Sequence, residues 1–186
     1  MKELGLRPVP NRQCGECNAC CRYLTVNTTE IVKLPNVLCG HWKGGCTIHE
    51  NWPTICRDFF CGWRLFDNLS DAWRPDRSNI LVQLHAPTEA GPAADLILLG
   101  PLGDSMTGEL LNYIAALIEA GYRAFLALPG PPGHFVRKIF LNNAMAPAMA
   151  ARDIEQAQAA LQDAIRKCTA LPTEPIVMGP PAELRY

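Results

Sequence analysis

The sequence predicts an α+β protein in which an irregular, cysteine-rich N-terminal module is joined to a small antiparallel sheet with two helices. Eight of the nine cysteines lie within residues 14–61, a stretch with few long apolar periodic runs. From residue 79 onward, apolar residues instead recur at the spacings of strands and helices. Their order, β-β-α-β-β-α, is typical of a sheet with helices on one face.

The first elements of the second half are a hairpin and a helix. Residues 80–85 and 95–99 are short aliphatic runs separated by a loop rich in Pro, Gly and Ala, and they predict paired strands. Leucines and isoleucines then recur at three- and four-residue spacing between Asp104 and Gly121. This pattern, with Gly-Asp-Ser before it and a glycine after it, predicts an amphipathic helix.

The remaining elements are two strands and a final helix. Residues 122–128 and 134–141 are β-prone runs on either side of a Pro-Gly turn. The last helix is expected to begin near Pro147, because proline is favoured in a first helical turn. It should bury one apolar stripe that runs from Ile154 to Cys168.

Composition shifts predict the boundaries along the chain. We expect a tail over 1–13, the cysteine-rich metal-binding module over 14–66, a polar connector over 67–78, the small α+β domain over 79–171 and a Pro-rich tail over 172–186. A module this short and irregular buries little apolar surface, so cross-links have to contribute to its stability.

The overall composition excludes several classes of partner. The chain has 186 residues, of which 48% are hydrophobic and 19% charged, as in ordinary globular proteins. Lys and Arg number 17 against 18 Asp and Glu, for a formal net charge of -1. We therefore expect no nucleic-acid partner and no membrane partner, and no apolar run approaches the roughly 20 residues of a membrane span. Whether the chain has a protein partner is unknown from its sequence.

The cysteines predict a metal centre. The first ten residues lack the apolar core of a secretory signal, so we expect a cytoplasmic protein, in which thiols stay reduced. A cysteine cluster there indicates metal or redox chemistry, and thiolates suit zinc and iron–sulfur clusters, each usually with four ligands. The pattern does not distinguish these two cofactors. The expected ligands are Cys14, Cys17, Cys20, Cys21, Cys39, Cys46, Cys56 and Cys61.

The spacing leaves the pairing of these ligands open. The two-residue gaps between Cys14, Cys17 and Cys20 let neighbouring sulfurs reach one metal. Cys21 follows directly, and adjacent side chains point in different directions, so Cys20 and Cys21 are not expected to serve one small ion equally well. In a helical version Cys14, Cys17 and Cys21 would share a face and leave Cys20 for a second centre; a loop version is the alternative. The later four cysteines have wider gaps and fit a site closed by folding.

The same residues resemble a known family. CGECNACC at 14–21, Cys39, CTIHE at 46–50 and WPTICRDFFC at 52–61 together resemble the YkgJ-like CxxCxxCC family, described as zinc- or iron-chelating cysteine-cluster proteins. The resemblance implies the eight cysteines as ligands and a bacterial cytosolic setting. His49 stands where Tyr is common and Trp52 where Arg is common, and both departures leave the thiol pattern intact. The match covers about a quarter of the chain.

Other residues near the thiols are expected to support the centre. His41 and His49 flank Cys46 and are interpreted as neighbours of the metal more than as ligands. Four thiolates around Zn²⁺ leave a net charge of minus two, so nearby cations have a reason to be present. The candidates are Arg12, Arg22, Arg57 and Arg64.

The sequence thus predicts a metal-binding protein without naming its biochemical role. Two alternatives stay open: an iron–sulfur oxidoreductase or metal-dependent enzyme of unknown substrate, and a module whose surface the metal shapes for protein interaction. Whether the chain is an enzyme is not decided by the sequence.

Overall fold

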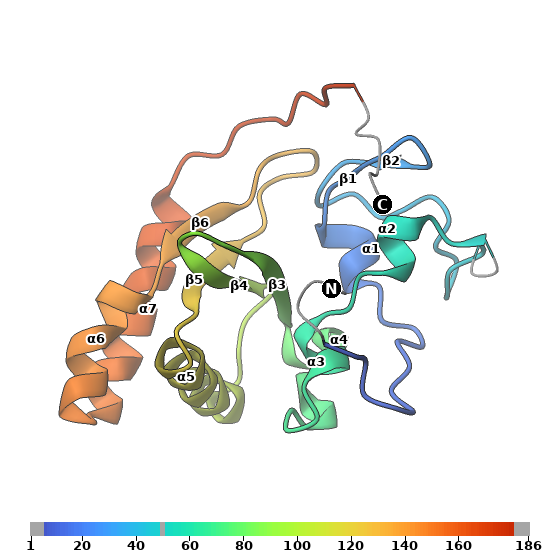
Figure 1. Cartoon of the computed structure of the whole chain (residues 1–186). Helices are drawn as coiled ribbons and strands as arrows, with labels where there is room; N and C mark the ends of the chain where they lie inside the picture. The colour runs from blue at the N-terminus through green and yellow to red at the C-terminus, as the bar shows by residue number, and fades with distance from the viewer. Residues whose placement is uncertain (1–5, 49–50, 181–186) are drawn as a thin grey trace.

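The computed structural model describes residues 6–48 and 51–180, and it has an α+β fold (Figure 1). Strands β3 (Ile80–Thr88), β4 (Gly91–Leu98), β5 (Arg123–Leu128) and β6 (Arg137–Phe140) form one sheet in the order β3-β4-β5-β6. The α+β class expected from the sequence is confirmed.

The expected antiparallel sheet is wrong in one pairing. β3 pairs with β4, and β5 with β6, in antiparallel fashion, whereas β4 and β5 are parallel. The reason is the connection between them. Helix α5 (Asp104–Glu119) carries the chain back along the sheet, so β5 starts at the same edge as β4 and runs beside it in the same direction. The sheet is therefore mixed.

The expectation of two helices in this part is also wrong. The final helical segment is divided into α6 (Asn142–Ala151) and α7 (Ile154–Ala170), which gives the order β-β-α-β-β-α-α. Arg152 has a left-handed backbone with φ 54°, which ends α6. The Asp153 side chain then accepts a hydrogen bond of 3.0 Å from the Gln156 amide and caps α7. Pro147 lies inside α6 instead of at a helix start.

The core lies between the sheet and these helices. Leu96 and Leu126 from the sheet are fully buried together with Leu110 and Ile114 from α5. Helix α7 packs against β5 and β6 and buries Cys168, as its apolar stripe predicts. Ile154, at the start of the expected stripe, is instead 71% exposed because it occupies the first position of α7, at the end away from the sheet.

The cysteine-rich module, residues 14–66, contains only short elements. They are α1 (Ala19–Tyr23), β1 (Val26–Asn27), β2 (Val32–Lys33), α2 (Thr54–Arg57) and α3 (Gly62–Leu65). β1 and β2 form a two-stranded antiparallel sheet. In Figure 1 these elements lie together on the side of the large sheet where β3 forms the edge, away from α6 and α7.

Residues 67–78, treated above as a connector, contain the short helices η3 (Asp71–Trp73) and α4 (Pro75–Ser78). Trp73 is buried in the main core, where its indole nitrogen donates a 2.5 Å hydrogen bond to Glu109 of α5 and its ring lies 5.0 Å from that of Tyr113. This stretch therefore packs the module against the sheet domain.

After α7 the chain returns toward the module as an extended segment, residues 172–180, here called the C-terminal strap (Figure 1). The amide of Phe135 donates to the Glu174 carbonyl at 2.9 Å, and the amide of Ile176 donates to the Gly133 carbonyl at 2.8 Å. Asn27 of β1 donates to the Gly179 carbonyl at 3.3 Å. The strap thus contacts both the β5–β6 loop and the module.

None of the helices in the described part of the chain combines the length and the apolar character needed to cross a membrane.

Candidate metal centre

All nine cysteines are free thiols, and the eight of the module gather around α1. Each of the eight lies close enough to at least one other for their charges to influence each other's ionisation. Cys61 is buried, Cys14 and Cys56 are exposed, and the other five are intermediate. Cys168 is apart from them, in the core side of α7. The three thiol-bearing stretches of the sequence thus converge.

Helix α1 carries the two adjacent cysteines. The Cys20 thiol is hydrogen-bonded to the Cys21 sulfur. This bond, followed by burial, raises the pKa of Cys20 well above its ordinary value, and the same bond lowers the pKa of Cys21 to about 7. Beyond this contact, Cys20 has Cys14 and Cys61 as thiol neighbours. One thiolate of the pair is therefore favoured near neutral pH.

Cys61 stands at the N-cap position of α3, where free backbone amides are available. The backbone amides of Trp63 and Arg64 act to lower the pKa of its thiol, and Cys14 and Cys17 are its thiol neighbours. Burial nevertheless raises the pKa of Cys61 to about 11. A bound cation would reverse this preference, and the two amides would then stabilise the thiolate.

The Cys17 sulfur has backbone amides from two different helices, α1 and α4, beside it. Its sulfur accepts hydrogen bonds from the backbone of Ala19 in α1 and of Asp76 in α4. Burial outweighs these donors and raises the pKa of Cys17, and the negative charge of Asp76 adds to the rise. The connector therefore contributes a direct partner to a predicted ligand.

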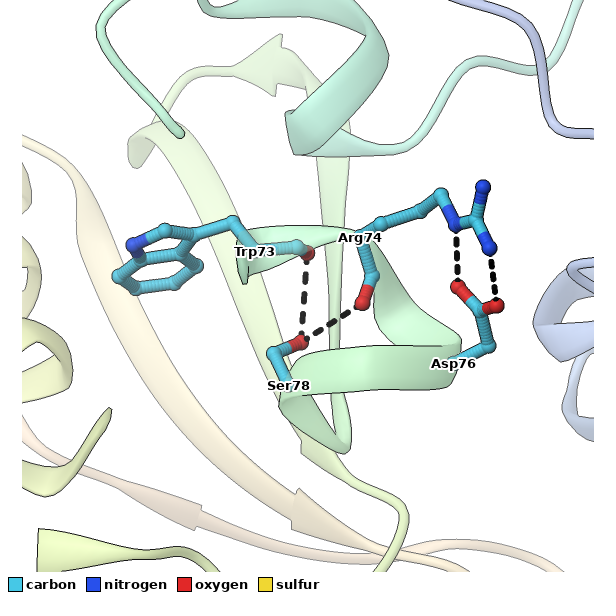
Figure 2. A network of polar contacts seen from close by, with 4 residues as sticks. All are labelled: Trp73, Arg74, Asp76 and Ser78. Carbon is cyan, nitrogen blue, oxygen red and sulfur yellow. Dashed lines mark hydrogen bonds and ion pairs between the residues drawn. The ribbon is translucent and has the colours of Figure 1, made fainter. Parts of the chain in front are cut away.

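Figure 2 shows the polar contacts of α4, to which Asp76 belongs. Arg74 donates two 2.6 Å hydrogen bonds to the Asp76 carboxylate, which keeps the pKa of that carboxyl below its usual range. The Ser78 hydroxyl is placed 3.2 Å from the Trp73 carbonyl oxygen and 3.3 Å from that of Arg74. These contacts close the single turn of α4. The charge of Arg74 also acts to lower the pKa of Cys14, although burial outweighs it and raises that pKa.

The remaining thiols of the module are those of Cys39, Cys46 and Cys56. The Cys39 amide donates a 2.9 Å hydrogen bond to the Cys21 carbonyl, and Cys46 forms a β-bridge with Trp42, whose own amide bonds the Cys39 carbonyl. Cys56, on α2, has Cys21, Cys39 and Cys46 as thiol neighbours. Desolvation of its sulfur, with these thiols adding to the effect, raises the pKa of Cys56 to about 11.

Lys33 is a buried cation beside these thiols that sequence reasoning missed. Its ammonium group donates to the carbonyls of Arg22, Leu34 and Val37 at 3.1, 3.0 and 3.2 Å. Burial lowers the pKa of Lys33, and the nearby Cys39 and Cys21 oppose that change. The only sequence signal is a single lysine between apolar residues on a short β-prone run.

The four arginines expected near the thiols differ in role. Arg64 is hydrogen-bonded to the Cys14 sulfur. Arg12 instead stabilises the loop after α3, because its guanidinium donates to the carbonyls of Trp63, Phe66, Asp67 and Leu69. Arg22 and Arg57 are exposed, and Arg57 lies 3.6 Å from Asp58.

Of the two histidines expected near the centre, His41 is exposed and His49 lies outside the described residues. Within residues 6–48 and 51–180, no group of three or more Cys, His, Asp or Glu side chains is arranged so that it could hold a metal ion. The thiols are thus neighbours without forming a completed coordination sphere.

A second polar cluster, also missed from the sequence, lies on the large sheet. Asp95 of β4 is buried, with its carboxylate oxygens 2.9 Å from His85 of β3 and 2.5 Å from Lys138 of β6. Burial acts to raise the pKa of Asp95, but the hydrogen bonds from His85 and Lys138 outweigh it and the pKa is lowered. Lys138 also lies 4.3 Å from the ring centre of Phe125. These contacts join all four strands of the large sheet.

Comparison with known proteins leaves the thiol site as the main guide to function. No protein-family model matches this chain, and neither a curated protein nor a solved structure matches it.

Proposed function

We propose that this chain is a metal-binding protein that holds zinc or an iron–sulfur cluster through the eight cysteines of its N-terminal module. We also propose that it acts in the cytoplasm and belongs with the YkgJ-like CxxCxxCC proteins, on the strength of the thiol pattern. The observation that carries the proposal is the gathering of eight free thiols from three stretches of sequence around one short helix.

The surroundings of the thiols support the proposal. Backbone amides near the sulfurs of Cys17 and Cys61 favour the thiolate forms, as is common for thiolates bound to metals. Lys33 and Arg64 supply positive charge beside the cluster, which offsets the negative charge of a centre with four thiolates. A bound zinc or cluster would supply the cross-links that the short elements of the module lack.

The test is elemental analysis and an absorption spectrum of the full chain purified without oxygen. Zinc in stoichiometric amount with no visible colour supports a zinc protein. Iron with acid-labile sulfide and broad absorption near 400 nm supports an iron–sulfur protein. A chain that carries none of these, and that binds no added Cd²⁺, contradicts the proposal. Replacing Cys168 by Ser is the matched control, because this thiol is remote from the module and its loss should not change the metal content.

A further inference from the structure

We propose that this chain has a second binding site, which takes a small oxyanion, a phosphate or carboxylate group, and does not use the thiols. The site is a cavity of about 260 Å³, here called the arginine cavity. It is lined by residues 11–13, Trp63 of α3, Asp71 of η3, Arg74 and Arg77. Pockets for drug-sized ligands are larger, so the ligand expected here is small.

The wall of the arginine cavity is positively charged. It carries the guanidinium groups of Arg12, Arg74 and Arg77, and among the described residues Asp71 is the one carboxylate that lines it. Arg74 is paired with Asp76, which lies outside the lining. The hydrogen bonds of Arg12 go instead to neutral backbone carbonyls. One positive charge therefore remains after both aspartates are counted, and it favours an anion.

The wall formed by residues 11–13 is fastened to α3. The amide of Val9 donates to the Arg64 carbonyl at 2.7 Å, and the amide of Arg12 donates to the Val9 carbonyl at 3.4 Å. Asn11, between them, has a left-handed backbone with φ 64° that turns the chain. The Cζ atom of Arg12 lies 5.3 Å from the ring centre of Trp63. This side of the cavity is therefore shaped before any ligand binds.

Arg74 has donors to spare. Its Nε and one terminal nitrogen each donate a 2.6 Å hydrogen bond to the Asp76 carboxylate, which fixes the plane of the guanidinium group. The other terminal nitrogen, Nη1, makes no hydrogen bond to the described residues, and Figure 2 shows it on the far side of the group from the carboxylate. A guanidinium group that is already held in place loses little freedom when it binds an oxyanion.

The indole of Trp63 adds an unused neutral donor to the wall. Trp63 is 5% exposed, and its Nε1 is buried without a hydrogen-bond partner in the part of the chain that the structure describes. Buried indole N–H groups usually have a partner, as that of Trp73 has in Glu109 at 2.5 Å. An acceptor oxygen held in the cavity would supply the partner that the protein does not.

These donors match the chemistry of an oxyanion. Phosphate and carboxylate groups combine a negative charge with several acceptor oxygens, so one group can take hydrogen bonds from a guanidinium and from an indole at once. A cationic ligand would be repelled by the arginines, and an uncharged one would leave their charge unbalanced.

The experiment titrates the full chain, labelled with ¹⁵N at its tryptophan indoles, with inorganic phosphate and separately with acetate at constant ionic strength. The Trp63 indole signal is identified by its absence from Trp63→Phe. It should shift and saturate with at least one of the two anions. A response to phosphate alone assigns a phosphate group as the ligand, and a response to acetate alone assigns a carboxylate.

The matched pair of variants is Arg77→Gln and Arg166→Gln. Both side chains are exposed, but Arg77 lines the cavity whereas Arg166 lies on α7 and pairs with Asp163. Calorimetric titration should show about fivefold weaker binding in Arg77→Gln, as for the loss of one exposed charge contact, and no change in Arg166→Gln. This comparison holds even if Trp63→Phe does not fold. Absence of a saturable response to both anions, or equal weakening in the two arginine variants, would overturn the proposal.

Discussion

At the scale of single residues, the site depends on charges held inside the protein. Lys33 is 7% exposed, and its ammonium group satisfies three backbone carbonyls. The thiols near it are those of Cys39, Cys21, Cys20 and Cys56. A buried ammonium group with these partners has two roles. It closes the turn after β2, and it would balance part of the charge of the proposed metal–thiolate centre.

Replacing Lys33 by Met should therefore destabilise the module and weaken metal retention. The three carbonyls would lose their donor, at a cost of roughly 1–3 kcal/mol for each group left unsatisfied. We expect a lower midpoint of thermal unfolding and faster loss of metal to a chelator. Lys43→Met is the matched control, because Lys43 is exposed. Equal chelation rates in the two variants would contradict the role assigned to Lys33.

Asp95 provides a prediction for pH dependence. Its pKa in the folded protein is lowered, so its ion pairs stabilise the fold above the ordinary Asp value of about 3.9, and this stabilisation is lost as the pH falls through the lowered folded value. Asp95→Asn should reduce the free energy of unfolding at pH 7 by roughly 1–3 kcal/mol. The difference from the native chain should shrink below about pH 4.

Urea unfolding of the native chain and the Asp95→Asn variant between pH 3 and 7 measures this difference. Acid release of a metal affects both chains alike and therefore cancels in the comparison. Asp163→Asn is the control, since Asp163 forms only exposed pairs with Arg166 and Lys167 on α7. A difference that grows toward acid pH would show that Asp95 does not stabilise the fold through its charge.

At the scale of elements, the close approach of α3 to β3 joins the module to the large sheet. Gly62 is the first residue of α3, and a Cβ built there would lie 2.7 Å from the Val82 Cβ. Cys61 directly precedes it. The packing of this one helix on the sheet therefore determines where the Cys61 sulfur lies.

Gly62→Ala should push α3 away from β3 and destabilise the chain by about 1–3 kcal/mol, as overpacked cores do. Gly108→Ala is a sharp contrast, because a Cβ at Gly108 in α5 meets nothing within 4 Å. That change should stabilise the chain by about 0.5–1 kcal/mol, since alanine favours a helix. Chemical denaturation of both variants checks the pair, and equal effects would mean that the contact at Gly62 is easily relieved.

Apolar spacing within single segments predicts most of the helices and strands. The features that this spacing missed depend on contacts between different segments of the chain. The apolar spacing in α5 and the aliphatic runs of β3 and β4 are properties of single segments, so the sequence predicts them directly. The parallel pairing of β4 with β5 depends on the path of α5. The break before α7 depends on a left-handed Arg152, a residue type that does not usually end helices.

The same distinction applies to the candidate site. The thiol-rich pattern is dense enough to be recognised by composition, and its spacing predicts metal ligands. The roles of Lys33 and Asp76 were not predictable, because each meets its thiols only through contacts between distant parts of the chain.

At the scale of the whole molecule, the module and the sheet domain differ in what stabilises them. The sheet domain has a shared core of leucines and isoleucines from β4, β5 and α5. The module has helices and strands of two to five residues. We therefore expect metal to contribute much of the stability of the module and little of that of the sheet.

Removal of metal by a chelator under reducing conditions should raise amide hydrogen exchange in the module, residues 14–66, and leave β4 and β5 protected. Hydrogen exchange with mass spectrometry measures both regions in one experiment. Reloading with zinc, or with iron and sulfide, should restore the original exchange. Simultaneous loss of protection in β5 would mean that the two regions unfold as one unit.

The position of the C-terminal strap in the sequence has a consequence for the synthesis of the protein on the ribosome. Asn27 in the module is hydrogen-bonded to Gly179, which the ribosome adds 118 residues after Cys61. At 5–20 residues per second, roughly 6–24 s pass between the synthesis of Cys61 and the synthesis of Gly179. The β3 edge that receives α3 is also made after every one of these thiols. The nascent chain therefore carries all eight thiols of the module during this time, before the strap can bond to Asn27.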